Sequence, residues 1–233
     1  MTREEFITSL QESYRLVSVL SDKNNCKVLR LRNLNTNRDL ILRSLPSDTE
    51  VYTRLCGIRC RNLPETYDVI QTQDGQIVLE EFIDGITVAQ VMETGRYRYR
   101  GAKQVLIGVC NALSVLHDLE IIHRDIKPEN VIVDNTGRVV LIDLNASRTE
   151  NSNGRDTVIM GTVGYAAPEQ LGLSTSDART DIYAMGVLLN VMLTGKHPTE
   201  AFAPGRAGRI VRKCTALNPN DRYQTALRLR DVL

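Results

Sequence analysis

A change in hydrophobic pattern near residue 85 is the feature that most restricts the fold of this chain. Before it, short runs rich in Val, Ile and Leu alternate with Asn, Asp and Ser turns, which is typical of β-strands. These runs cover residues 16–20, 27–32, 39–45, 66–70 and 76–82, with one helical segment at 48–57. After residue 85, apolar residues recur at helical spacing. The sequence therefore predicts an α+β fold with a sheet-rich part at residues 1–83 and a helical part at 84–233.

Composition excludes several classes of protein. The 233 residues are 42% hydrophobic and 24% charged with a net charge of +1, so neither disorder nor obligatory nucleic-acid binding is expected. No apolar run approaches the ~20 residues that span a bilayer, and the N-terminus lacks a signal-peptide pattern. The five cysteines are odd in number and lack CxxC spacing, which favours reduced thiols and a cytoplasmic protein.

A short β-hairpin predicted at residues 131–142 has polar residues at both ends. Asp125, Lys127 and Asn130 come before the first strand, and Asp143 follows the second. Because a hairpin brings its two ends together, we expect these four side chains to converge. Carboxylate and amide oxygens suit Mg²⁺, and a nearby cation suits a phosphoryl group in transfer. This pattern predicts phosphoryl-transfer chemistry at the open end of the hairpin.

Residues 123–130, His-Arg-Asp-Ile-Lys-Pro-Glu-Asn, resemble the catalytic loop of eukaryotic-like serine/threonine protein kinases. The resemblance extends over residues 14–233 through motifs in the family's order. They are the hinge-like 81–85, Asp-Leu-Asn at 143–145 in place of Asp-Phe-Gly, the activation-segment end at 161–169 with Ala-Pro-Glu at 167–169, Asp181 with Gly186, and Arg222. Lys127, two residues after Asp125, follows the serine/threonine pattern.

The resemblance implies a bilobal kinase fold: a small lobe with a five-stranded sheet and one helix, and a larger helical lobe. It implies transfer of the γ-phosphate of ATP to a Ser or Thr hydroxyl of a protein. Asp125 would orient and deprotonate the hydroxyl, Lys127 would steady the γ-phosphate, and Asn130 with Asp143 would hold Mg²⁺. Thr162 would hydrogen-bond Asp125 and Lys127. The residues expected to contact the nucleotide are Val28, Ile41, Arg43, Glu81, Ile83 and Ile132.

Other residues carry structural or regulatory expectations from the same resemblance. Asp181 and a Glu169–Arg222 pair would be structural. Arg124 precedes the catalytic aspartate, a pattern associated with regulation by phosphate on the activation segment. Thr157 or Ser152 would then be the phosphorylated residue, whereas the alternative is that both are ordinary polar loop residues.

The glycine-rich phosphate loop and the phosphate-binding lysine of the family are both replaced. The three loop glycines fall on Ser21, Lys23 and Cys26, so the segment is either an altered phosphate contact or an ordinary hairpin turn. Arg43 stands in place of the lysine that holds the α- and β-phosphates, and its planar fork does not reproduce a point charge. Ile41 replaces the alanine over the adenine ring and adds bulk there.

The carboxylate that normally pairs with that lysine is also displaced. Counting along the helix puts the family's glutamate at Val51, with Glu50 one residue away and about 100° round the helix. Glu50 would therefore need a register shift to face Arg43. The gatekeeper position, before the hinge, is occupied by Glu80 in place of an apolar residue.

These departures leave three functions open. The first is a phosphotransferase with an altered nucleotide grip, which the intact group of Asp125, Lys127, Asn130 and Asp143 favours. The second is a pseudokinase that serves as a nucleotide-sensing or scaffolding module. The third is a small-molecule phosphotransferase of the aminoglycoside-kinase type, which shares the catalytic Asp and Asn but usually lacks the Ala-Pro-Glu segment and the buried helix Asp.

Overall fold

The computed structural model describes all residues except 24, 48, 150–161, 163 and 172–175. The chain divides into two compact units. The first comprises residues 1–60 and 64–83, and the second comprises residues 61–63 and 84–233. Each unit is built around its own buried apolar residues.

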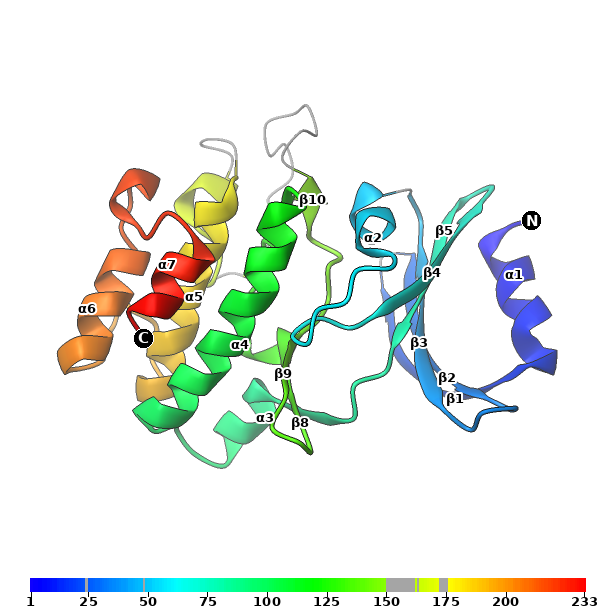
Figure 1. The fold of residues 1–233 in the computed structure, drawn as a ribbon, viewed down its shortest axis with the longest axis horizontal. Helices are drawn as coiled ribbons and strands as arrows, with labels where there is room; N and C mark the ends of the chain where they lie inside the picture. The colour runs from blue at the N-terminus through cyan, green and yellow to red at the C-terminus, as the bar shows by residue number, and fades with distance from the viewer. Residues whose placement is uncertain (24, 48, 150–161, 163, 172–175) are drawn as a thin grey trace. The chain divides into compact units, whose positions relative to one another are not determined.

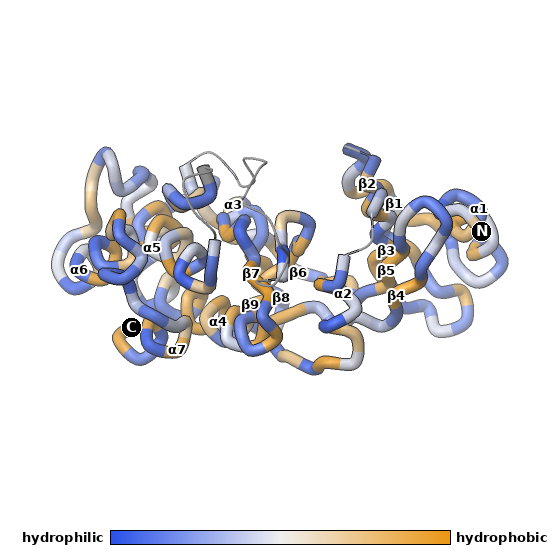
Figure 2. The backbone as a smooth tube through the Cα atoms, turned by 90° about the horizontal axis from the view of Figure 1, so that it is seen from above, coloured by the Kyte–Doolittle hydropathy of each residue, from blue (hydrophilic) through white to orange (hydrophobic). Residues whose placement is uncertain are grey.

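The first unit is an antiparallel five-stranded sheet with strand order β1-β2-β3-β5-β4. Its strands are β1 (Tyr14–Lys23), β2 (Cys26–Asn33), β3 (Asp39–Leu45), β4 (Thr66–Thr72) and β5 (Gly75–Glu81). Four of these strands contain a predicted run whole, and β5 ends one residue before the end of the predicted run 76–82. The agreement arises because β-branched and aliphatic side chains pack well on a half-buried pleated surface. Hydrophobic segments follow the central strands β3 and β5 in Figure 2.

The expectation of a single helix in this part of the chain is wrong. Helix α1 (Arg3–Ser9) precedes the sheet, and α2 (Glu50–Leu55) lies on the opposite face (Figure 1). Thr2 and Glu5 close a capping box at the start of α1. Phe6, Ile7 and Leu10 pack against the buried cluster Leu29, Leu31, Leu40, Leu42 and Ile77. A helix this short is only marginally stable in isolation, so its packing against the sheet stabilises it. The helix was missed because its local sequence signals are weak.

Arg3 joins α1 to two turns and to the sheet. Its guanidinium donates to the backbone oxygen of Asn25 at 3.0 Å, to Asp74 Oδ2 at 3.3 Å and to Ser44 Oγ at 3.4 Å. Its backbone N–H donates to Asp74 Oδ1 at 2.8 Å. These bonds to Arg3 hold the pKa of Asp74 below its usual range. The buried Arg3 therefore fastens α1 to the β1–β2 and β4–β5 turns.

We expect Arg3→Ala to lower the free energy of unfolding by about 1–3 kcal/mol, because several hydrogen bonds to one buried cation are lost. Urea denaturation measures this change. Arg15→Ala removes an exposed arginine of β1 and should change the stability by no more than about 0.5 kcal/mol. Equal stabilities of the two variants would show that Arg3 does not fasten α1.

The second unit is helical, with two small sheets. Its helices are α3 (Val88–Glu93), α4 (Tyr99–Asp118), α5 (Ala178–Thr194), α6 (Gly205–Cys214) and α7 (Ala226–Asp231). One sheet has the order β6-β8-β9, formed by β6 (Gly85–Thr87), β8 (Val131–Asp134) and β9 (Val139–Leu141). The other pairs β7 (Ile121–Ile122) with β10 (Arg148–Thr149). Short 3₁₀ turns occupy Pro128–Asn130, Pro168–Leu171 and Pro219–Asp221 of this unit, and another occupies Leu10–Glu12 of the first unit.

Helix α5 forms the centre of this unit, with eleven buried residues. Gly186 permits its close contact with α6: a Cβ there would lie 2.4 Å from the Cβ of Cys214. Asp177 caps the first turn by accepting from the N–H of Arg179. Within the described ranges, no helix is both long enough and apolar enough to span a bilayer.

Candidate active site

The β8–β9 hairpin brings the two polar segments together as its sequence predicts. Val131 pairs with Leu141, and the N–H of Ile142 donates to the backbone oxygen of Asn130 at 2.9 Å. Asn130 therefore lies beside the residue that precedes Asp143. The 3₁₀ turn Pro128–Asn130 leads directly into β8 and fixes the approach of the catalytic-loop backbone.

Asp125 is the centre of a polar cluster in this unit. Lys127 Nζ lies 2.7 Å from Asp125 Oδ2 and 2.7 Å from Thr162 Oγ1. Thr162 Oγ1 donates to Asp125 Oδ1 at 2.8 Å, and its N–H donates to the same oxygen at 3.2 Å. Asn130 Nδ2 donates to Asp125 Oδ2 at 3.0 Å and to the Asp125 backbone oxygen at 2.8 Å. The predicted bonds of Thr162 to Asp125 and Lys127 are confirmed.

This cluster keeps the Asp125 carboxylate ionised. Burial acts to raise its pKa, but hydrogen bonds from Lys127 and Thr162 and the Lys127 charge outweigh that effect. The pKa of Asp125 is therefore below its ordinary value. An ionised, oriented carboxylate can accept a hydrogen bond from an incoming hydroxyl and then its proton.

The backbone just before Asp125 is strained, and a buried carboxylate holds it. Arg124 has φ = 69°, which is uncommon for a residue with a Cβ. The N–H groups of His123 and Arg124 donate to Asp181 Oδ2 at 2.9 Å and Oδ1 at 2.8 Å. His117 Nε2 lies 2.8 Å from Asp181 Oδ2. Asp181, fully buried at the start of α5, thus fixes the direction in which the loop enters Asp125.

His117 is a positioning group that sequence reasoning missed. Helical spacing places it at the end of α4, where it lies, but nothing in the local sequence connects it to a carboxylate 64 residues later. Burial acts to raise the pKa of Asp181, whereas the bond and charge of His117, the His123 charge and the Arg124 N–H together lower it below its ordinary value.

We expect Asp181→Asn to lower the free energy of unfolding at pH 7 by about 3–5 kcal/mol, because one member of a buried network is lost. The folded pKa of Asp181 lies below the unfolded value, so its contribution exists above about pH 4 and is lost as the pH falls through the folded pKa. Urea denaturation at pH 7 and pH 3 measures the free energy of unfolding of parent and variant. The difference between the two proteins should be smaller at pH 3 than at pH 7.

Asp118→Asn, an exposed change at the end of α4, is the matched control and should alter stability by at most about 0.5 kcal/mol at both pH values. A stability difference between parent and Asp181→Asn that stays constant from pH 7 to pH 3 would contradict an ionised Asp181.

Asn130 and Asp143 have the donor chemistry for Mg²⁺. Asn130 uses Nδ2 for both bonds to Asp125, so its Oδ1 is the atom suited to a cation. Asp143 adds a carboxylate and has φ = 68°, a second left-handed residue at this end of the hairpin. The described residues contain no group of three or more His, Cys, Asp or Glu arranged for a metal. Two protein oxygens fit Mg²⁺, which keeps water and phosphate ligands.

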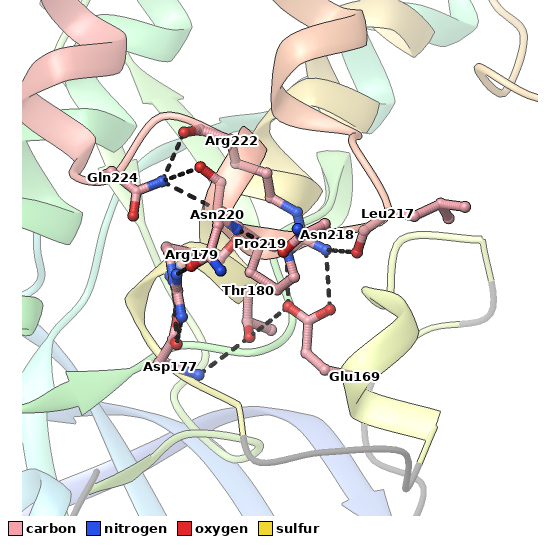
Figure 3. A network of polar contacts seen from close by, with 10 residues as sticks. All are labelled: Glu169, Asp177, Arg179, Thr180, Leu217, Asn218, Pro219, Asn220, Arg222 and Gln224. Carbon is pink, nitrogen blue, oxygen red and sulfur yellow. Dashed lines mark hydrogen bonds and ion pairs between the residues drawn. The ribbon is translucent and has the colours of Figure 1, made fainter.

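The predicted Glu169–Arg222 pair is confirmed (Figure 3). Arg222 Nη1 and Nη2 lie 2.6 and 3.0 Å from Glu169 Oε1 and Oε2, a bidentate pair with both side chains buried. Thr180 Oγ1 donates to Glu169 Oε1 at 3.0 Å. Next to Glu169, Gln170 Nε2 donates to the backbone oxygen of Arg124 at 2.9 Å. This network joins the end of the activation segment to α5 and to the catalytic loop.

The residues expected to contact the nucleotide lie on identifiable strands. Val28 is on β2 opposite Arg43, and Ile41 is on β3 opposite Glu80. Antiparallel pairing places these four side chains on one face of the sheet. The remaining predicted residues are Glu81, which ends β5, Ile83, which follows it, and Ile132 on β8 of the second unit. Their contacts with a nucleotide stay predictions.

Glu80 is the partner of Arg43 that sequence reasoning missed. Arg43 Nε donates to Glu80 Oε1 at 2.6 Å, and each side chain is 7% exposed. Glu50 instead lies on the surface of α2 and pairs with Arg54 at 3.0 Å, while Val51 is buried. The alternation of side chains between the two faces of a strand could have suggested the Arg43–Glu80 pair. That inference would also have required the register between β3 and β5, which the sequence alone does not give.

The segment aligned with the phosphate loop continues the β1–β2 ladder. Ser21 pairs with Val28, and Lys23 pairs with Cys26 next to the turn. The remaining predictions in the activation segment, Ser152 and Thr157, lie outside the described residues, as do the motif residues at 161 and 163.

Comparison with known proteins agrees with this geometry. Protein kinase domains match residues 19–226. The serine/threonine-protein kinase PknB of Mycolicibacterium smegmatis is 29% identical over 95% of this chain and 42% of its own length. PknB of Mycobacterium tuberculosis is 28% identical over the same shares. A probable serine/threonine-protein kinase PknB of Corynebacterium glutamicum is 37% identical over 54% of this chain and 20% of its own length.

The chain thus spans about two fifths of the length of the PknB relatives that it matches over nearly its whole extent. Its sheet-rich N-terminal part and helical C-terminal part confirm the predicted mixed α+β class. The match covers most of the chain, from within β1 to the start of α7, and includes the Asp125 cluster, Asp181 and Glu169. On this evidence the chain belongs to the protein kinase domain family.

Proposed function

We propose that this chain is a serine/threonine protein kinase domain that transfers the γ-phosphoryl group of ATP to a protein hydroxyl. The observation that carries the proposal is the Asp125 cluster, in which an ionised carboxylate is held by Lys127, Asn130 and Thr162. An ordinary turn has no need of a partly buried, charge-paired carboxylate with this set of donors. The PknB relatives, named as serine/threonine-protein kinases, support the same reaction class.

Each residue of the cluster then has a distinct role. Asp125 orients the acceptor hydroxyl and takes its proton as the new oxygen–phosphorus bond forms and the bond from the γ-phosphorus to the leaving ADP oxygen breaks. Lys127, between Asp125 and Thr162, balances negative charge on the transferring group. Asn130 and Asp143 hold Mg²⁺. Bound Mg·ATP supplies the phosphoryl group and the metal charge.

A nucleotide-binding pseudokinase is the second candidate, and a specific observation favours it. Arg43 is paired with Glu80 inside the sheet, and the phosphate-loop segment is a paired hairpin without the family's glycines. Both features affect residues expected to bind the nucleotide, and neither affects the Asp125 cluster. The small-molecule class gains less support, since Asp181 and the Glu169–Arg222 pair are both present and buried.

We expect the chain to incorporate labelled phosphate from ATP into a protein substrate. Asp125→Asn and Asp143→Asn should each reduce this by at least about 100-fold, because the first removes the general base and the second removes a carboxylate proposed to hold Mg²⁺. Scintillation counting with casein as the probe protein measures the transfer. Asp118→Asn should keep the activity of the parent.

Equal signals from the parent and both active-site variants would contradict the proposal, because the activity would come from a contaminant. Absence of transfer together with stabilisation by Mg·ATP in a thermal shift would favour the pseudokinase.

A further inference from the structure

Strand β1 lies at one edge of the five-stranded sheet. In the order β1-β2-β3-β5-β4 it pairs with β2 on one side, and among the described residues no strand pairs with its other side. Alternate residues of such an edge strand direct their backbone N–H and C=O groups away from the sheet. The outer side of β1 is therefore a row of donors and acceptors with which another strand can pair.

Four apolar side chains lie together on this edge strand and are exposed. They are those of Leu16, Val17, Val19 and Leu20, with exposed fractions of 53%, 40%, 55% and 53%. Natural edge strands are usually protected by charged residues, which discourage pairing with another chain. Here the charged residues of β1 are Arg15, Asp22 and Lys23, which all lie outside the apolar segment. The middle of the strand therefore lacks the usual protection.

Two of these four residues lack an opposite residue within the sheet. The pairing of β1 with β2 shifts register at two places, so Val17 and Leu20 face no residue of β2 in the described ladder. Side chains in a sheet gain much of their stabilisation from the residue directly opposite on the neighbouring strand. For Val17 and Leu20, that neighbour has to come from the outer side of β1.

The sequence of this segment indicates which strand fits there. Leu16-Val17-Ser18-Val19-Leu20 reads the same in both directions. If two copies of the strand pair antiparallel about a two-fold axis at Ser18, facing residues lie at equal distances from that axis. Leu16 then faces Leu20 of the second copy, Val17 faces Val19, and Ser18 faces Ser18. Apolar side chains meet only apolar ones, and both residues that face no residue of β2 gain an opposite residue.

We propose that this chain forms a homodimer through β1, in which the outer edges of two copies pair antiparallel about a two-fold axis at Ser18 and join two five-stranded sheets into one. The second strand belongs to another copy of this chain because self-pairing satisfies a palindromic strand residue by residue. An unrelated partner would need no palindrome. The interface is short, so we expect a weak dimer with a Kd of about 1–100 µM. The dimer does not depend on the phosphate transfer proposed above.

Sedimentation velocity of the whole chain at increasing concentration measures this association. The parent should show a monomer–dimer equilibrium. Because Ser18 faces itself across the axis, Ser18→Lys and Ser18→Glu each bring two like charges together, and each should weaken the dimer by at least about tenfold. An equimolar mixture of these two variants places opposite charges at the axis and should regain the dimer. Such a recovery is the signature of a residue that faces its own copy.

Two further variants separate association from folding. Val19→Lys adds a charge to a side chain that is more than half exposed, so it should melt as the parent does and sediment as a monomer. It decides the test if the Ser18 variants do not fold. Leu217→Lys removes an apolar side chain that is 80% exposed on the second unit, and it should dimerise as the parent does. Thermal melting of every variant checks the fold.

Each outcome supports or overturns the dimer. A parent that stays monomeric up to about 1 mM overturns the proposal, because β1 would then be covered by something other than a second copy or by nothing. A dimer that persists in the folded Ser18 and Val19 variants overturns it, since association would use another surface. Equal loss of the dimer in Leu217→Lys would indicate unspecific apolar association and also overturns it. Loss in the Ser18 variants with recovery in their mixture supports it.

Discussion

The buried carboxylate of Asp181 is the constraint on which the catalytic loop depends. Two consecutive backbone N–H groups, those of His123 and Arg124, bind its two oxygens, and Arg124 adopts a left-handed conformation that a free loop rarely keeps. The helix that carries Asp181 is held in turn by the Glu169–Arg222 network through Thr180. The position of Asp125 therefore depends on buried charged residues that are distant from it in the sequence.

The Asp125 cluster and the residues expected to bind the nucleotide differ in how closely they follow the kinase family. Around Asp125, the carboxylate, lysine, amide and hydroxyl are those expected of a kinase, and their bonds are short and mutual. In the first unit, Arg43 and Glu80 replace two residues of the family with a pair inside the sheet. A buried ion pair contributes little net stability, so the pair does not by itself indicate a more stable sheet. The change from the family's pattern therefore places the carboxylate that pairs with the cation on a strand, and does not remove it.

Much of the site was accessible from the sequence because it is local. Asp125, Lys127 and Asn130 lie within six residues and flank a hairpin whose closure brings Asp143 near, so spacing alone predicts their proximity. Thr162 and the Glu169–Arg222 pair followed from a resemblance to a family with known contacts. Helix α1, His117 and Glu80 were not anticipated in their roles. The contacts that define those roles depend on packing or register, which the local spacing does not encode.

The sequence by itself determined the five strand segments before residue 85, the change to helical spacing after it, the α+β class and the set of polar groups at the hairpin. Each of these follows from short-range periodicity and turn chemistry. Only the tertiary structure decided which carboxylate serves which cation. Glu80 and not Glu50 binds Arg43, and Asp181 binds the loop amides, because strand register and helix rotation set side-chain direction. A rotation of about 100° between neighbouring helix positions is enough to send one acid to solvent and bury its neighbour.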